Sequence, residues 1–286
     1  MDKLRLYSLI GILSIAIIGC NLLTAENPTL DYPTTYPVIS LPELEAMNSE
    51  YQSANDNRIC STLNEYGFTG FSEILFLDGT NPCDRANRDV VRVEMNEPDT
   101  LLKAAQKALL KNSEYTGVTD SSALFLKDIS PQPGCVNCGR PDEYSANIEW
   151  RLTFGRQLID STEVPGTEII VFFDALGVNR IWGNWYPNVT IPNFVNYGYA
   201  EVQAGMVGWQ IDMRPYTGES KIYTIKAEDL TERPTKVLVP YENVAQERLE
   251  IRYCWAVQID HPNEEFDGWT AYIDIEEGIL VKLTSR

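Results

Sequence analysis

The chain has 286 residues, with 23 Lys and Arg against 41 Asp and Glu, and a formal net charge of −18 at pH 7. This length is ample for a hydrophobic core and favours one large or two modest domains. An acidic surface repels nucleic-acid phosphates and anionic lipid headgroups, so the composition excludes a nucleic-acid-binding protein.

The N-terminus has the pattern of an export signal. Basic residues precede an apolar run over residues 6–18, which is too short for a comfortable membrane span. The run ends in Ile17-Ile18-Gly19-Cys20, which resembles a bacterial lipobox. This resemblance implies that residues 1–19 are removed and that Cys20 carries a lipid in the bacterial cell envelope. An ordinary secretory leader cut after Ala25 and a retained anchor helix are the alternatives, and all three export the chain.

Export makes disulfides the expected state of the other cysteines. The candidates are Cys60, Cys83, Cys135 and Cys138. The last two lie among Pro and Gly, which predicts a local staple in a loop rather than a redox site at a helix start. Cys60 and Cys83 flank a Gly- and Asn-rich segment and form a plausible second bridge. A zinc site that uses Cys135 and Cys138 is the alternative, and Cys254 is expected to be a free, buried thiol.

Two segments give clear helix signals. Residues 20–40 lack apolar periodicity and predict a tether, after which Ser40 and Pro42 mark the start of a helix over residues 41–54. Residues 99–111 carry apolar side chains at helical spacing. A third helix is expected over residues 193–206, because Pro192 precedes it and glycines end it.

Runs of β-branched and aromatic residues predict the strands. They cover residues 90–93, 123–129, 148–154, 168–173, 178–185, 236–240, 249–259, 269–273 and 279–283. Asp174 and Gly177 bound one tight hairpin, and Asp274 and Gly278 bound another. A helix followed by an antiparallel meander therefore occurs twice, which predicts an α+β chain of two modules, residues 41–192 and 193–286.

The two halves resemble a known family. The strand Trp150–Phe154, followed by Val164–Ile169 and the Asp174 hairpin, resembles propeptide domains of the thermolysin and fungalysin type. The residues around Trp255 and the strand that ends at Asp274 resemble the related PepSY domain. The resemblance covers residues 99–190 and 193–284 and implies two tandem cystatin-like modules, each with one helix packed on a curved antiparallel sheet.

Members of this family are intramolecular chaperones and inhibitors of proteases, or binding modules on the outer face of bacterial membranes. The sequence ends three residues after Leu283, and no protease follows the second module. The resemblance therefore implies that any action on a protease occurs in trans.

The residues do not assemble a recognised catalytic motif. His261 is the single histidine, and no Gly-x-Ser-x-Gly pattern supplies a nucleophile for it. The acidic stretch from Asp260 to Asp267 lacks the spacing of an EF-hand, so we predict a solvated loop rather than a calcium site. We expect no enzyme activity, no metal and no cofactor.

Trp182, Trp185 and Tyr186 follow one another near the end of a predicted strand and form a possible partner-binding group. Strand alternation gives the other interpretation, in which one Trp faces the core and the other covers the interface between modules.

The sequence thus predicts an exported, lipid-anchored and non-catalytic protein-binding chain that modulates a secreted or envelope protease. The expected binding mode is insertion of a partner segment along an exposed sheet edge. The alternative is a carbohydrate-binding protein or a hydrolase that uses surface carboxylates and Trp residues.

Overall fold

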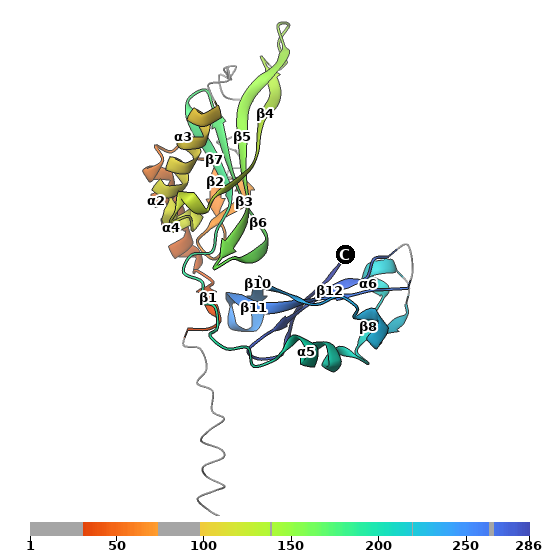
Figure 1. Ribbon diagram of the computed structural model, residues 1–286. Helices are drawn as coiled ribbons and strands as arrows, with labels where there is room; N and C mark the ends of the chain where they lie inside the picture. Colours follow the sequence, from red (N-terminus) through yellow and green to blue (C-terminus); the bar gives the residue numbers. More distant parts are fainter. Residues whose placement is uncertain (1–30, 74–97, 138, 219, 263–265) are drawn as a thin grey trace, which may run out of the picture.

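A computed structural model describes residues 31–73, 98–137, 139–218, 220–262 and 266–286. The fold is α+β, with two main antiparallel sheets and helices beside each (Figure 1). In the described ranges the helices are α2 (Leu41–Ala54), α3 (Pro98–Lys111), α4 (Ser113–Thr116), α5 (Tyr199–Met206) and α6 (Arg214–Thr217).

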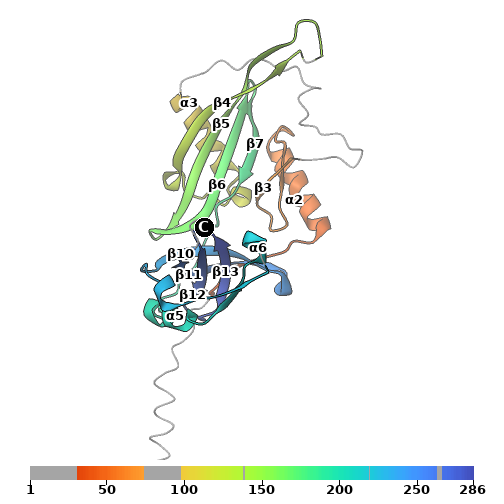
Figure 2. The same ribbon diagram turned by 90° about the vertical axis from the view of Figure 1, so that its right-hand side faces the viewer.

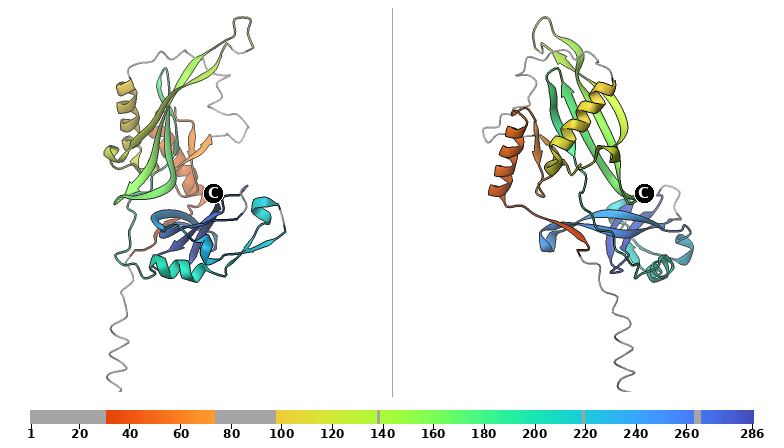
Figure 3. Two further views of the ribbon diagram at one scale, coloured as in Figure 1. Left: turned by 45° about the vertical axis from the view of Figure 1, so that its right-hand side comes forward. Right: turned by 60° about the vertical axis from the view of Figure 1, so that its left-hand side comes forward.

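The first sheet is an antiparallel meander in the order β4-β5-β6-β7. Its strands are β4 (Phe125–Val136), β5 (Tyr144–Ile159), β6 (Thr162–Asp174) and β7 (Gly177–Gly183). Alternate residues of β5, Trp150, Leu152 and Phe154, point to one face, because side chains alternate along a strand. Helix α3 covers that face with Ala105 and Leu109 (Figure 3).

The second sheet is built around β11 and includes the start of the described chain. Its strands are β1 (Thr34–Pro37), β10 (Thr235–Asn243), β11 (Arg248–Ile259), β12 (Trp269–Asp274) and β13 (Leu280–Ser285). One edge of β11 pairs with β10, and the other pairs with β1 over residues 248–251 and with β12 over residues 254–259. Helix α5 and the hairpin of β8 (Gln210–Asp212) and β9 (Ile222–Thr224) cover one face of this sheet.

Two short strands, β2 (Ser61–Leu63) and β3 (Thr69–Glu73), lie with α2 beside β7 (Figure 2). The Cys60 N–H donates to the Asn179 carbonyl at 2.7 Å, and the Thr69 hydroxyl donates to the Gly183 carbonyl. The two sheets meet where β10 packs against β6. Val164 of β6 belongs to the core of the second sheet for this reason.

The predicted helices over residues 41–54 and 99–111 are confirmed. The third helix begins only at Tyr199, so its predicted start at residue 193 is wrong. Tertiary hydrogen bonds hold the preceding backbone: the Tyr197 N–H donates to Ile275 O at 3.1 Å, and Trp255 Nε1 donates to Tyr197 O at 2.8 Å. Those groups are therefore unavailable for a first helical turn.

The predicted strands in the described ranges are all present, although several are longer than expected. The strand predicted over residues 90–93 lies outside the described residues. Residues 34–37 form β1 rather than part of a tether, and β4 continues to Val136, so Cys135 lies in a strand rather than a loop. The more specific expectation, two cystatin-like modules, stays a prediction.

Candidate functional site

Strand β13 has an open edge. It pairs with β12 on one side, and no strand in the described part of the chain pairs with the other side. Three edges of the main sheets are protected: β4 carries Pro131 and Pro133 with two register shifts, β2–β3 lies beside β7, and β10 packs against β6. Proline, bulges and covering segments are the usual means by which proteins block an edge, so β13 is the edge best placed to accept another strand.

The ladder with β12 shows which β13 backbone groups point outward. The Arg286 N–H donates to the Gly268 carbonyl at 3.0 Å, which makes these two residues a hydrogen-bonded pair. Since hydrogen-bonded and non-hydrogen-bonded pairs alternate in an antiparallel ladder, Ser285 and Leu283 direct their N–H and C=O groups away from β12. These groups could pair with an added strand.

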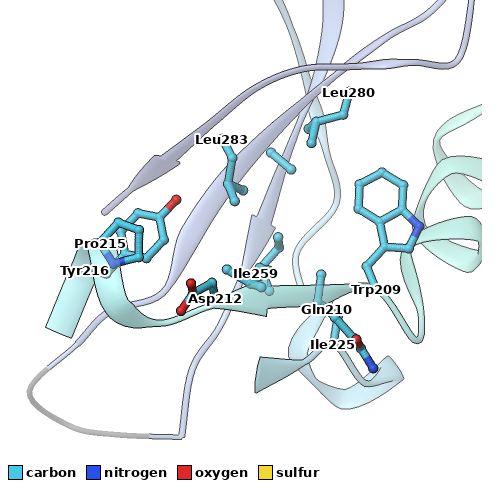
Figure 4. A pocket seen from close by; sticks show the side chains of 11 residues that line it. Trp209, Gln210, Asp212, Pro215, Tyr216, Ile225, Ile259, Leu280 and Leu283 are labelled. Atoms are coloured by element: carbon cyan, nitrogen blue, oxygen red, sulfur yellow. The ribbon is translucent and has the colours of Figure 1, made fainter. Parts of the chain in front are cut away.

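An apolar pocket of about 280 Å³ opens beside this edge (Figure 4). Trp209 and Leu280 lie at one end, and Leu283 and Tyr216 lie toward the other. The pocket is lined by Trp209, Gln210, Ile211, Asp212, Pro215, Tyr216, Ile225, Ile259, Ala271, Leu280 and Leu283. Asp212 is the single charged residue of this lining, so the pocket suits an apolar side chain.

A cluster of aromatic rings supports the pocket from behind. Trp269 is fully buried and contacts Tyr216, which lines the pocket, with ring centroids 5.7 Å apart. His261 packs on Tyr223 at 4.6 Å and on Trp269 at 5.5 Å. Burial and the charge of Lys221 lower the pKa of His261, although Asp229 acts in the opposite direction. His261 therefore acts as an uncharged member of an aromatic cluster.

A buried ionic cluster lies in the second sheet. Arg252 pairs with Glu250 at 2.6 Å, with Asp274 at 3.0 Å and with Glu277 at 2.8 Å. Burial disfavours the charge of Glu250, but hydrogen bonds from Asn243, Arg248 and Arg252 outweigh it and lower the pKa of Glu250. Each ionisable group thus has a structural partner.

Tyr32 connects the start of the described chain to that cluster. Its hydroxyl donates to Asp274 Oδ2 at 2.8 Å and accepts the Tyr253 N–H at 2.8 Å. Burial and the neighbouring Asp274 carboxylate raise the pKa of Tyr32 well above its ordinary value. The hydroxyl therefore stays protonated and acts as a structural clamp.

The structure places the three predicted partner-binding aromatic residues in different surroundings. Trp185 is only 3% exposed and belongs to the core of the first sheet. Trp182 lies on the opposite face, with its ring 4.9 Å from that of Phe172. Tyr186 packs between the sheets, and its backbone carbonyl accepts a hydrogen bond from Gln157 at 2.7 Å. The three side chains do not form one open surface.

Cys60 and Cys135 are each disulfide-bonded, whereas Cys254 is free and buried. The other candidates, Cys83 and Cys138, lie outside the described residues, as does Cys20, so the pairing and the lipid anchor stay predictions. Burial raises the pKa of the Cys254 thiol, with a further contribution from Asp274. Cys254 is therefore an unreactive core residue.

Sequence reasoning missed the pocket and could not place the open edge. The lining residues come from α6, β8, β12 and β13 and from the ends of other elements, so no single stretch of sequence carries their pattern. The one local signal was Trp209, a large aromatic residue between Gly208 and Gln210 that is 36% exposed.

Within the described ranges, no group of three acidic, histidine or cysteine side chains is arranged to hold a metal ion. In the same ranges, none of the helices is both long and apolar enough to cross a bilayer.

No family model and no curated protein sequence matches the chain. Among solved structures, the chain is similar to the Bacillus megaterium YpeB C-terminal domain, with a TM-score of 0.27 and 9% sequence identity. The likeness covers 70% of this chain and 69% of that chain. At so low a TM-score it supports no conclusion about function.

Proposed function

We propose that the chain is an exported, lipid-anchored and non-catalytic protein that binds an extended segment of a protein partner along β13. The observation that supports this proposal is the open edge of β13 beside an apolar pocket. An added strand would gain backbone hydrogen bonds from Leu283 and Ser285, and one of its side chains would enter the pocket. Backbone pairing gives such a complex affinity, and the pocket gives it specificity.

The proposed partner is an envelope or secreted protease whose activity the chain modulates in trans. The resemblance of the two halves to propeptide and PepSY domains supports this choice of partner. The net charge of −18 favours a partner with a basic surface, because complementary charges speed association.

A hydrolase is less well supported by the linings of two pockets in the described part of the chain. Retaining or inverting glycosidases need two facing carboxylates. The β13 pocket has one carboxylate, that of Asp212. A second pocket, between α2 and α3, has Asp56 beside the cations Arg58, Lys107 and Lys111. Neither lining provides a catalytic pair.

The anchor is tested separately by mass spectrometry of the mature protein isolated from its cells. We expect an N-terminus at Cys20 that carries a lipid, and we expect Cys20→Ser to abolish the modification. A mature N-terminus after Ala25 would refute the anchor and leave the binding site untouched.

Ser285 offers a sharp test of the binding edge. Ser285→Pro removes an outward N–H group without touching the ladder to β12, whereas Ser285→Ala changes the same side chain and keeps that group. Purified wild-type protein and Ser285→Ala should recover the same protease from solubilised envelope and change its rate of casein hydrolysis. Ser285→Pro should lose both effects.

Recovery of the protease by Ser285→Pro at the wild-type level would refute edge binding. Recovery of no protease by any of the three proteins would refute the proposed function itself.

A further inference from the structure

The segment that contains α5 carries exposed apolar side chains and almost no charge. Residues 193–210 contain one charged residue, Glu201, whereas 22% of the whole chain is charged. Large apolar side chains are exposed along the segment: Phe194, Val195, Tyr197, Tyr199, Val207 and Trp209. We call these six residues the α5 face. Exposed apolar side chains that gather on one segment mark an interaction site more often than scattered ones do.

The α5 face lies next to the point where the described chain begins. Tyr32 binds Asp274, and Asp274 opens the turn to Gly278. The ring of Tyr197 packs over Gly278, and Asn196 Nδ2 donates to the Glu276 carbonyl at 3.1 Å in the same turn. One turn of the second sheet thus holds both the start of the described chain and one end of the α5 face.

Few residues of sequence separate Cys20 from this point. Twelve positions separate Cys20 from Tyr32. A flexible chain of that length has an average end-to-end distance of about 20 Å. With a lipid on Cys20, the surface around Tyr32 would be held near the bilayer at a high effective concentration.

We propose that the α5 face rests on the surface of the lipid bilayer. This proposal rests on the lipid anchor of the proposed function. Tyr and Trp suit the bilayer interface, because their rings enter the acyl boundary while their polar atoms stay at the headgroups. The guanidinium of Arg233 lies 4.9 Å from the Tyr199 ring, at a position where it can meet a lipid phosphate.

The net negative charge of the whole chain indicates the headgroup charge of the bilayer. A net charge of −18 opposes an anionic bilayer, but the α5 face carries little of that charge. The proposed occupant is therefore a zwitterionic bilayer such as phosphatidylcholine. With the α5 face on the membrane, the first sheet would project away from it, since α5 and the first sheet lie at opposite ends of the molecule (Figures 1 and 2).

Trp209 is a built-in reporter for this contact. It is 36% exposed, whereas Trp150, Trp185, Trp255 and Trp269 are at most 8% exposed. The mature protein, as isolated from its cells, is mixed with or reconstituted into vesicles of brominated phosphatidylcholine, which quenches nearby Trp emission. We expect quenching of the wild-type emission and loss of that quenching in Trp209→Phe. Trp182→Phe is the matched control and should keep it.

A charge test uses exposed positions, where substitution leaves the core intact. The double variant Phe194→Glu/Val207→Glu should lose the quenching, while Phe125→Glu/Val244→Glu, with the same charge change on other exposed residues, should keep it. Circular dichroism verifies the fold of each variant.

Quenching that persists in Trp209→Phe, or that survives Phe194→Glu/Val207→Glu, would overturn the proposal. If the lipidated protein shows no quenching, contact between the α5 face and the bilayer would be refuted, whereas the lipid anchor would be retained. If the mature protein isolated from its cells carries no lipid and its emission is still quenched, contact between the α5 face and the bilayer would be supported and the lipid anchor would be refuted. Loss of protease recovery in the charged α5 variant, without lipid quenching in the wild type, would show that the face docks a protein and would also overturn the proposal.

Discussion

Arg252 is a buried cation shared by three carboxylates. Its side chain is 7% exposed, and those of Glu250 and Asp274 are fully buried. Charges in such surroundings lose much of their hydration, and pairing compensates for that loss. Removing Arg252 should therefore cost more stability than removing the cation of an exposed ion pair.

We predict that Arg252→Ala lowers the free energy of unfolding by about 3–5 kcal/mol, because it removes the cation that pairs with buried Asp274 and leaves buried Glu250 with Arg248 alone. Lys226 pairs with Glu228 at 3.5 Å with both side chains exposed, and Lys226→Ala should cost less than about 1 kcal/mol. Urea unfolding of the two variants measures the difference. Equal losses would contradict the assigned role of the cluster.

The lowered pKa of His261 predicts that stability depends on pH in a range above the pKa values of ordinary carboxylates. Its pKa in the folded protein lies below the ordinary value of 6.5, so the unfolded chain takes up a proton first as the pH falls. The stabilisation is present above pH 6.5 and is lost as the pH falls from there through the lower pKa of the folded protein. Since His261 is the only histidine, the window from pH 7.5 to 5.5 isolates it.

Thermal unfolding across this window measures the effect. The wild-type melting temperature should fall relative to that of His261→Gln as the pH decreases, and a constant difference between the two would contradict the prediction.

At the scale of elements, the end of α4 and the turn after it contact the segment that follows β7. The Trp185 N–H donates to the Thr116 carbonyl at 2.8 Å, and the next residue, Gly117, has φ of 71°. A Cβ atom at Gly117 would overlap the Trp185 carbonyl oxygen. Glycine is required there both for the backbone conformation and for the close approach.

Gly117→Ala should therefore cost at least about 2 kcal/mol more than Gly166→Ala. Gly166 has a similar φ of 76°, but nothing lies within 4 Å of its added Cβ, so only the conformational cost of about 1 kcal/mol applies. Denaturant unfolding compares the two variants. A similar loss in both would show that the contact with Trp185 is unimportant.

The sequence predicted the elements that carry a local pattern. Helix α3 and the strands β5, β6, β11 and β12 repeat apolar residues at the period of their structure. The short strands β1, β2, β3, β8 and β9 were not predicted, because three to five residues carry no periodicity and their partners decide their conformation. The late start of α5 was missed for a related reason, since distant residues bind the backbone of Tyr197.

The sequence predicted the kind of binding site, an exposed sheet edge, but not which strand provides it. An exposed sheet edge follows from the predicted meander, but the choice of β13 depends on what covers the other edges. The three aromatic residues near the end of β7 were conspicuous in the sequence. The fold uses Trp185 in the core and Tyr186 between the sheets.

At the scale of the whole molecule, the first described strand, β1, belongs to the same sheet as the last four strands, β10–β13. Thr34 pairs with Ile251, and the Tyr32 hydroxyl bonds to Asp274. Residues 41–73, which follow, belong instead with the first sheet. The two sheets are therefore joined by two chain crossings.

Tyr32→Phe should lower the free energy of unfolding by about 1–3 kcal/mol, because it removes one hydrogen bond from the buried Asp274 carboxylate and leaves the Tyr253 N–H without a partner. Tyr272→Phe is the control, since the Tyr272 hydroxyl makes no hydrogen bond with the described residues. Hydrogen exchange of the β1 amides should accelerate in Tyr32→Phe alone. Unchanged exchange there would contradict a clamp at Tyr32.

The pairing of β1 with β11 has a consequence for the order of assembly. A protein chain is synthesised from its N-terminus, so β1 is complete more than two hundred residues before its partner. Contacts so distant in sequence are slow to form, because a long loop must close first. The first sheet can fold while synthesis continues, whereas β1 can pair only after β11 has been synthesised. A chain truncated before residue 248 would thus leave both of its ends unfolded.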